Sequence, residues 1–283
     1  MTIDYQAVMA LEPVVRVQRY EARDLILYAL GIGLGRDPTD PTELRFLYEK
    51  DLRALPTMPA AMCFASMRHF NLGANLARSL HGEQRLIIHR PLPTAGVMRG
   101  TTRISDVIDN GPGKGALLLV EREMVDDGTG ELLATAGLTI FCREDGGFGG
   151  PLRARPATHN VPRRMPDAVI EVSTSPRAAL IYRLSGDDQP LHVDPDIARE
   201  AGFERPILHG LATFGAICWT AVRTFLDGDG DAVTQFEGRF SAPVLPGEAL
   251  RIELWRDTSI ISVRAATVEQ GRVVFDNGLL QFR

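Results

Sequence analysis

The chain has 283 residues, of which 45% are hydrophobic and 24% charged, a composition typical of a globular protein with room for two domains. Its formal net charge of −5 argues against nucleic acid or an anionic membrane as a partner. No leader peptide, long apolar run or C-terminal targeting tripeptide is recognisable, so we expect a cytoplasmic protein. Cys63, Cys142 and Cys218 lack C-x-x-C spacing and are expected to be buried, reduced thiols.

The first half of the chain predicts one long helix followed by strands. Met58–Leu80 is apolar over most of its length and is the helix candidate. Turn signals such as Asp127-Gly128 separate the segments that follow it. The strands are expected at Gln84–His89, Val97–Ile108, Ala116–Val125 and Leu132–Phe141.

A glycine-rich segment and a stretch rich in proline and arginine then interrupt the pattern. Their composition is typical of a linker rather than of a helix or strand. We therefore expect an N-terminal half at 1–150, a linker at 151–166 and a C-terminal half at 167–283.

The second half again predicts an apolar helix among strands. Asp194 at the N-cap, Pro195 at the first helical position and Gly202 beyond the end predict a short helix. A second helix should begin at Gly210 and continue to Leu226, with one charge, and a helix without a polar face must be buried on all sides. The strands are expected at Ala168–Val172, Ala179–Leu184, Val233–Phe240, Ala249–Trp255, Ser259–Thr267 and Val273–Phe282.

Two pairs of similar segments relate the halves. Arg90–Gly96 resembles Ala242–Gly247, and each opens a region rich in strands. Glu131–Arg143 matches Arg272–Arg283 in its spacing of Gly, Phe and Arg. An antiparallel sheet wrapped around an apolar helix is the arrangement that this order indicates. The expected fold is therefore α+β, a tandem (double) hot-dog.

The segment from Tyr182 to Pro195 carries the clearest chemical signal. Asp187 and His192 stand five residues apart in a turn-rich context, where a carboxylate and an imidazole can hold one water and move its protons. The helix that begins at Gly210 would present free N–H groups to a carbonyl oxygen that gains negative charge. His209, just before it, has three possible roles: to cap the helix, to pack, or to touch substrate. The corresponding part of the first half, 51–58, has no histidine, so we expect one active site per chain.

Other chemistries fit the sequence poorly. The remaining histidines are scattered without carboxylate neighbours, so no metal site is expected. The glycines at 31–35 and 146–150 match neither a dinucleotide fingerprint nor a phosphate loop, and no G-x-S-x-G motif occurs. The remaining set of groups suits the addition of water across a double bond conjugated to a carbonyl.

These residues resemble a known family. Tyr182–His192 is similar to the motif aromatic-x-L-S-G-D-x-N-P-L-H, and Pro206–Gly215 is similar to its continuation P-I-L-H-G-L-x-T-F-G. Both are motifs of the MaoC-like, (R)-specific enoyl-CoA hydratases, most closely of the hydratase 2 domain of peroxisomal multifunctional enzymes. Segments 28–33, 55–57, 81–84 and 146–150 also look like double hot-dog members, so the resemblance covers nearly the whole chain.

The resemblance implies an activity and a division of labour. Asp187 and His192 would activate the water that converts a trans-2-enoyl-CoA into a (3R)-3-hydroxyacyl-CoA, and Gly210 would supply the oxyanion N–H. Gln189 stands where the family has Asn. Its carboxamide, which is one methylene longer, would position the water or His192. The first half would lodge the acyl chain. Its implied substrate contacts are Pro56, Thr57, Met58 and Phe148, together with His209 of the second half.

The resemblance also implies no cofactor apart from the CoA of the substrate, and a homodimer. Two alternatives remain open at this stage. One is a hot-dog acyl-CoA thioesterase, which would release free thiol. The other is an acyl-CoA-binding subunit without activity, which the Asn-to-Gln departure at Gln189 would favour.

Overall fold

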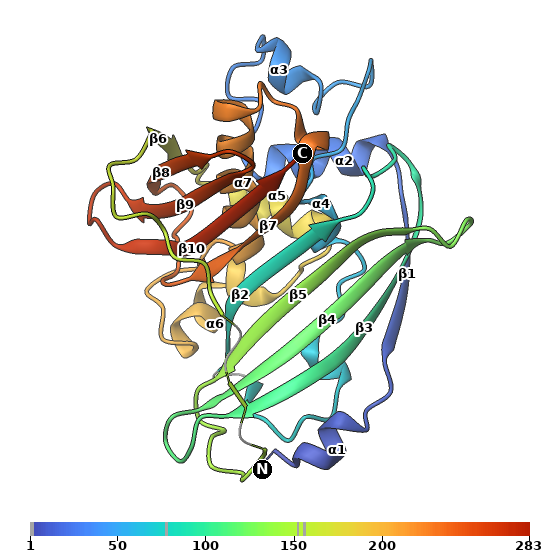
Figure 1. Cartoon of the computed structure of the whole chain (residues 1–283), viewed down its shortest axis with the longest axis vertical. Helices are drawn as coiled ribbons and strands as arrows, with labels where there is room; N and C mark the ends of the chain where they lie inside the picture. Colours follow the sequence, from blue (N-terminus) through green and yellow to red (C-terminus); the bar gives the residue numbers. More distant parts are fainter. Residues whose placement is uncertain (1–2, 77–78, 152, 155–156) are drawn as a thin grey trace.

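The computed structural model describes residues 3–76, 79–151, 153–154 and 157–283 (Figure 1). Residues 152, 155 and 156 of the expected linker lie outside the described residues. The α-helices are α1 (Tyr5–Met9), α2 (Ala22–Gly31), α3 (Pro41–Leu44), α4 (Met58–Ala61), α5 (Ala178–Tyr182), α6 (Pro195–Glu200) and α7 (Gly210–Phe225). The described 3₁₀ turns are η1 (Met67–His69), η3 (Arg183–Ser185), η4 (Pro190–His192) and η5 (Gly230–Ala232).

Ten strands form one antiparallel sheet in the order β1-β3-β4-β5-β2-β7-β10-β9-β8-β6. The order of the last five strands mirrors that of the first five, so the two halves are copies joined edge to edge through β2 and β7. The strands are β1 (Val14–Tyr20), β2 (Ser79–Ile88), β3 (Gly96–Asp109), β4 (Ala116–Asp126), β5 (Leu132–Cys142), β6 (Ala168–Ser173), β7 (Val233–Phe240), β8 (Ala249–Asp257), β9 (Ile260–Thr267) and β10 (Val273–Phe282).

The junction of the halves is held by backbone pairing and by charge. Glu83 of β2 lies opposite Arg239 of β7 in the register. Their side chains form an ion pair, with Arg239 Nη2 2.6 Å from Glu83 Oε1. The mirrored order and the central helix establish the double hot-dog fold that the sequence predicts.

Helix α7 forms the core of the second half. Every residue from Leu211 to Val222 is buried, and the helix packs against β7, β8 and β9 (Figure 1). Phe214 packs among aromatic rings of the sheet, with its centroid 4.3 Å from that of Phe236 and 6.2 Å from that of Phe275. Arg223 is the charge at the end of the helix and pairs with Asp40 and Glu43.

Over the described residues, the first half has no equally long central helix, so the predicted helix at Met58–Leu80 is wrong. Helix α4 has four residues, because Met62 is extended with ψ 156° and Cys63 has a positive φ of 50°. The chain then forms η1, and Leu80 belongs to β2. Residues 77 and 78 of that predicted helix lie outside the described residues. The apolar composition of this segment predicts a helix, but these backbone angles end the helix after one turn.

A second prediction was also wrong. Ala179–Leu184, expected as a strand, forms α5 and then η3. Ala178, Ala179 and Tyr182 are its buried residues, and this spacing places them on one helical face. Short apolar runs do not distinguish a strand from a buried helix. The sequence reading also missed β1 and α2.

The other expectations for local structure are confirmed. Asp194 caps α6, with its Oδ1 accepting from the N–H of Asp196 at 2.8 Å, and Pro195 occupies the first helical position. Cys63, Cys142 and Cys218 are free and buried. Among the described residues, no helix has both the length and the apolarity to cross a membrane.

Shortening a fully buried side chain of α7 should cost much of the protein's stability. Ile217 is 0% exposed, so Ile217→Ala leaves a cavity and is expected to lower the free energy of unfolding by about 2–5 kcal/mol. Leu180→Ala on α5, where Leu180 is 56% exposed, should change it by less than about 0.5 kcal/mol. Urea unfolding of both variants measures the difference, and equal effects would show that α7 is not the core.

Candidate active site

The loop after α5 sets the position of Asp187. Gly186 ends η3 with a φ of 128°, a conformation that favours glycine. A Cβ at Gly186 would lie 3.4 Å from the Ala61 carbonyl oxygen at the end of α4, so the loop runs close to the first half. Asp187 is half-buried, and its Oδ1 accepts from the backbone N–H of Gln189 at 3.3 Å.

His192 is fixed by its own turn and by one hydrogen bond. It ends η4, whose first residue is Pro190. Its Nδ1 lies 2.9 Å from the carbonyl oxygen of Ile207. A carbonyl only accepts, so Nδ1 carries the proton and Nε2 keeps a lone pair. The ring therefore presents a proton acceptor to the site.

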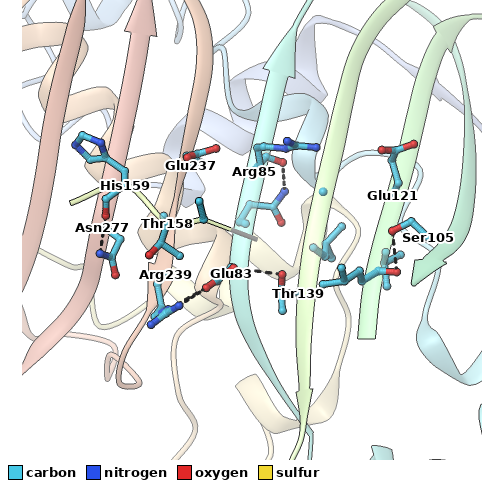
Figure 2. A pocket seen from close by; sticks show the side chains of 17 residues that line it. Glu83, Arg85, Ser105, Glu121, Thr139, Thr158, His159, Glu237, Arg239 and Asn277 are labelled. Carbon is cyan, nitrogen blue, oxygen red and sulfur yellow. Dashed lines mark hydrogen bonds and ion pairs between the residues drawn. The ribbon is translucent and has the colours of Figure 1, made fainter. Parts of the chain in front are cut away.

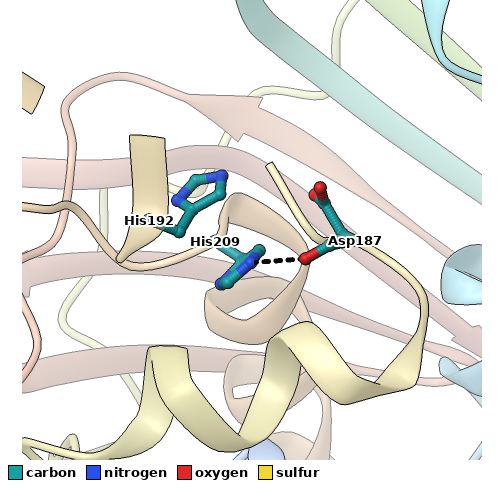
Figure 3. A group of neighbouring side chains, drawn as sticks. All are labelled: Asp187, His192 and His209. Atoms are coloured by element: carbon teal, nitrogen blue, oxygen red, sulfur yellow. Dashed lines mark hydrogen bonds between the residues drawn. The ribbon is translucent and has the colours of Figure 1, made fainter. Parts of the chain in front are cut away.

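His209 lies between the loop and helix α7 (Figure 3). Its Nε2–H donates to the backbone carbonyl of Asp187 over 3.1 Å. Its ring stacks on His192 with centroids 3.7 Å apart, and the Tyr182 ring lies 5.0 Å away on a tilted plane. His209 is 1% exposed and its Nδ1 has no hydrogen-bond partner among the described residues. This residue therefore ties the motif loop to the start of the helix.

Burial governs the protonation of the group. Burial raises the pKa of the Asp187 carboxyl, and the neighbouring His192 partly opposes this rise. Burial lowers the pKa of His192. Burial also lowers the pKa of His209 to about 3, with His192 adding to the effect. A neutral His209 is thus the form that this stack accommodates.

The spacing of the acceptors suits one water molecule. Asp187 offers a carboxylate oxygen, and His192 and His209 each offer a ring nitrogen. These three atoms lie within 4.8 Å of one another. A water that donates both hydrogens through bonds of about 2.8 Å at a near-tetrahedral angle spans acceptors about 4.5 Å apart. One water between Asp187 and His192 is compatible with this limit.

The same three side chains lack the geometry of a metal site. A ring nitrogen binds a metal along its lone pair, in the plane of the ring. The His192 and His209 rings are stacked, with an angle of 26° between their planes, so their lone pairs do not converge on one point nearby. The Nδ1 of His192 and the Nε2 of His209 are already donors. The arrangement does not fit a metal ion.

The start of α7 supplies the electrostatic part of the site. Ala212 and Thr213 donate their N–H groups to the carbonyl of His209, which leaves the first N–H groups, those of Gly210 and Leu211, without a partner within the helix. The positive end of the helix dipole lies here. A Cβ added to Gly210 would lie 3.5 Å from the Phe240 ring, an ordinary contact. The protein itself thus does not require glycine at this position.

The other predicted residues lie at different places. Pro56, Thr57 and Met58 are buried beside the site: Thr57 accepts from the Tyr28 hydroxyl at 2.9 Å, and the Tyr28 ring lies 5.9 Å from that of Tyr182. Phe148 instead packs in a separate core cluster with residues such as Val107, and its loop bonds to Asp109. The structure does not bring Phe148 to the Asp187 group.

Gln189 is exposed, and the contact it makes with Asp187 is through its backbone N–H. Its role in positioning water therefore stays a prediction.

Two contacts of the site were missed from the sequence. Tyr182 is buried against His209, and Ala61 approaches Gly186 from the first half. Tyr182 opens the motif, so a signal for it existed. Ala61 had none, because it was expected within a long helix.

A groove elsewhere on the molecule has a different character. It has a volume of about 190 Å³ and lies across the junction of β2 and β7 (Figure 2). Charged side chains of neighbouring strands line it, among them Glu83, Arg85, Glu121, Glu237 and Arg239. Asp187, His192 and His209 do not line this groove.

Acid should destabilise the protein through His209. In the unfolded chain a histidine gains a proton below about pH 6.5, whereas in the folded protein His209 stays neutral down to about pH 3. Protonation therefore favours the unfolded chain, and stability is lost as the pH falls through this window. The loss is about 1.4 kcal/mol per pH unit, or about 2 kcal/mol from pH 6.5 to pH 5. His209→Gln should remove this part of the loss in denaturant unfolding at the two pH values. An unchanged acid slope would contradict it.

Two family models match the chain. The model described as MFE-2 hydratase 2 N-terminal domain matches residues 18–144, and that of the MaoC like domain matches residues 157–277. Among solved structures, a MaoC-like dehydratase from Phytophthora capsici is 32% identical with a TM-score of 0.87, covering 98% of each chain. The chain also resembles full-length peroxisomal multifunctional enzyme type 2 from Drosophila melanogaster, with 34% identity and a TM-score of 0.83 over 96% of this chain and 48% of that one.

Curated relatives agree with these matches. The 3-hydroxyacyl-thioester dehydratase Y of Mycobacterium tuberculosis is 37% identical over 100% of this chain and 99% of its own length. The peroxisomal enoyl-CoA hydratase 2 of Arabidopsis thaliana is 36% identical over 90% and 88%. The mouse peroxisomal multifunctional enzyme type 2 is 37% identical, and the chain spans 36% of its length. The chain therefore belongs to the MaoC-like dehydratase family, in its hydratase 2 branch, and is an enzyme of the hydro-lyase class.

Proposed function

We propose that the chain catalyses the reversible, (R)-specific hydration of a trans-2-enoyl-CoA to a (3R)-3-hydroxyacyl-CoA. The observation that carries the proposal is the placement of two proton acceptors, the Asp187 carboxylate and His192 Nε2, beside the free N–H groups at the start of α7. The names of the Arabidopsis and Mycobacterium relatives support the acyl-thioester substrate.

The water would donate its two hydrogens to Asp187 and His192. Its lone pair then faces the substrate, and its oxygen bonds to C3 as one O–H bond breaks. The π electrons of the C2–C3 bond move toward the thioester, whose oxygen becomes an enolate oxygen. The proton held by the pair passes to C2, so the product contains both hydrogens and the oxygen of that water. Because the water and the proton come from one place on the protein, they add to one face of the C2–C3 double bond.

The enolate oxygen needs a donor at the moment its charge appears. The N–H of Gly210 lies at the positive end of a buried 16-residue helix, where water does not weaken the interaction. A glycine lets the thioester approach this N–H without a side chain in the way. The stabilisation is larger for the enolate than for the substrate, which is the condition for a gain in rate.

The first half would accommodate the acyl chain. Its central helix is reduced to the four residues of α4, and Pro56, Thr57 and Met58 are buried next to the motif loop. We place the part of the chain nearest the thioester against this segment. Gln189 would adjust the water from the exposed side of the loop.

The direct test is the loss of conjugated-thioester absorbance when the protein meets a panel of trans-2-enoyl-CoAs, with chiral analysis of the product. We expect the (3R)-hydroxy product. Asp187→Asn should lower kcat by at least about a hundredfold, because it removes the proton acceptor. Asp188→Asn, on the exposed neighbour, is the matched control.

Other outcomes would identify the alternatives. Release of free thiol from an acyl-CoA, without hydration, would indicate a thioesterase. Tight binding of enoyl-CoA without any product, with the affinity unchanged in His192→Ala, would indicate a binding subunit. The (3S) product would reject the stereochemical part of the proposal.

Gly210→Ala should separate folding from catalysis. The added methyl meets the Phe240 ring at an ordinary distance, and alanine favours a helix over glycine, so the thermal midpoint should not fall. The methyl should keep the thioester from the N–H and lower kcat by about a hundredfold or more. An active, stable variant would remove Gly210 from the mechanism.

A further inference from the structure

The inner face of β4 carries one residue that breaks its pattern. Strand β4 alternates, and its inward positions are buried and apolar except for Arg122, which is 3% exposed. The other inward residues are Ala116, Leu118, Val120 and Met124. A guanidinium therefore lies in the core of the half that is proposed to hold the acyl chain.

Among the described residues, this cation lacks a counter-charge. Its Nη2 donates to the carbonyl oxygen of Ala60 in α4, and its Nε has no hydrogen-bond partner. No carboxylate of the described residues pairs with it. Burial lowers the pKa of Arg122 to about 10, with the Cys63 thiol and the Tyr182 hydroxyl opposing the change. An unpaired buried charge is costly.

Two further buried polar side chains lie near it on the same face. Thr102 of β3 is directly opposite Arg122 in the register, and its Oγ1 has no partner. On the far side of β5, the residue of β2 in line with Arg122 and Ala136 is Leu86. Gln84 lies two residues further along β2, opposite Leu138, and its Oε1 has no partner among the described residues. Thr102 is 2% and Gln84 1% exposed. Arg122 and Thr102 are thus adjacent, and Gln84 lies further along the same face; a guanidinium donor, a hydroxyl and an amide oxygen lack partners among the described residues.

The cluster of Arg122, Thr102 and Gln84 is connected to the active site through α4. The carbonyl of Ala60 binds Arg122, and that of the next residue, Ala61, approaches Gly186 beside Asp187. Burial raises the pKa of the Tyr182 hydroxyl well above its usual value, and Arg122 partly opposes this, which places the cation near the ring that contacts His209. A chain that extends from the reacting carbons past α4 into the first half would meet this cluster.

We propose that Arg122, Thr102 and Gln84 form a polar subsite that selects acyl chains with an oxygen group distant from the thioester, with a terminal carboxylate as the best match. The carboxylate would accept from Arg122 and from the Thr102 hydroxyl, and it would neutralise the charge of Arg122. A hydroxyl end would instead accept from Arg122 and donate to Thr102 or Gln84. A purely hydrocarbon chain would leave all three groups unsatisfied. The inference rests on the proposed function, because it assumes that the first half holds the acyl chain.

The test compares trans-2-enoyl-CoAs of matched length that end in a methyl, a hydroxyl or a carboxylate, over a series of lengths. The wild type should prefer the carboxylate over the methyl end by about 10–100-fold in kcat/KM at the length that reaches Arg122, the value of one hydrogen bond to a charged group. Arg122→Met should bring this ratio close to one. Crotonyl-CoA, which is too short to reach the subsite, should be turned over equally by both proteins.

Two further variants complete the design. Arg103→Met removes an exposed arginine from β3 and should leave every ratio unchanged. Thr102→Val keeps the shape of the side chain and should reduce the preference less than Arg122→Met does. Thermal unfolding checks that each variant is folded. A hydroxyl preferred as strongly as a carboxylate, and lost in Arg122→Met, would also support the subsite, with a neutral oxygen as its ligand.

The inference is overturned if the wild type shows no preference at any length, or if Arg122→Met changes all substrates by the same factor. Binding affinities for saturated acyl-CoAs with methyl and carboxylate ends, measured by calorimetry, test the subsite separately from the proposed function. A carboxylate preference in binding that Arg122→Met removes would uphold the subsite even if no enoyl-CoA were hydrated. Hydration of crotonyl-CoA that depends on Asp187, without any end-group preference, would uphold the function and reject the subsite.

Discussion

Helix α7 has no polar face, and the rest of the second half is arranged by the need to enclose it. The sheet covers the helix along its length, so its first turn lies in a buried place rather than at the surface. The free N–H groups and the positive end of the dipole are therefore shielded from water. His209, bonded to the carbonyl of Asp187, fixes the motif loop to that turn. The burial that stabilises the fold thus also keeps the candidate site away from water.

The candidate site could be predicted largely from the sequence because its parts are local. Asp187 and His192 are five residues apart, and His209 and Gly210 follow within the same segment. Their contacts depend on a few turns and on one helix start. The strands from β3 onward were also predictable, with the exception of the segment that became α5, because their alternation or apolar runs are bounded by clear turns.

The rest depended on backbone geometry and on distant contacts. The left-handed Cys63, which ends the helical region after α4, has no signature in residue type. Nothing in the sequence showed that Arg122 would occupy an inward position of β4, or that Phe148 would pack away from the motif. Such facts come from the register of strands and from the packing of one segment on another, which a single sequence does not state.

The seam between β2 and β7 has a consequence for synthesis and folding. Glu83 and Arg239, which face each other across it, are 156 residues apart in the chain. Pairing of such distant segments is slow, because loop closure precedes any gain from the contact. The first half leaves the ribosome well before β7 does, so the edge of β2 stays open during that interval. This open edge is where a nascent chain of this protein is most exposed to aggregation.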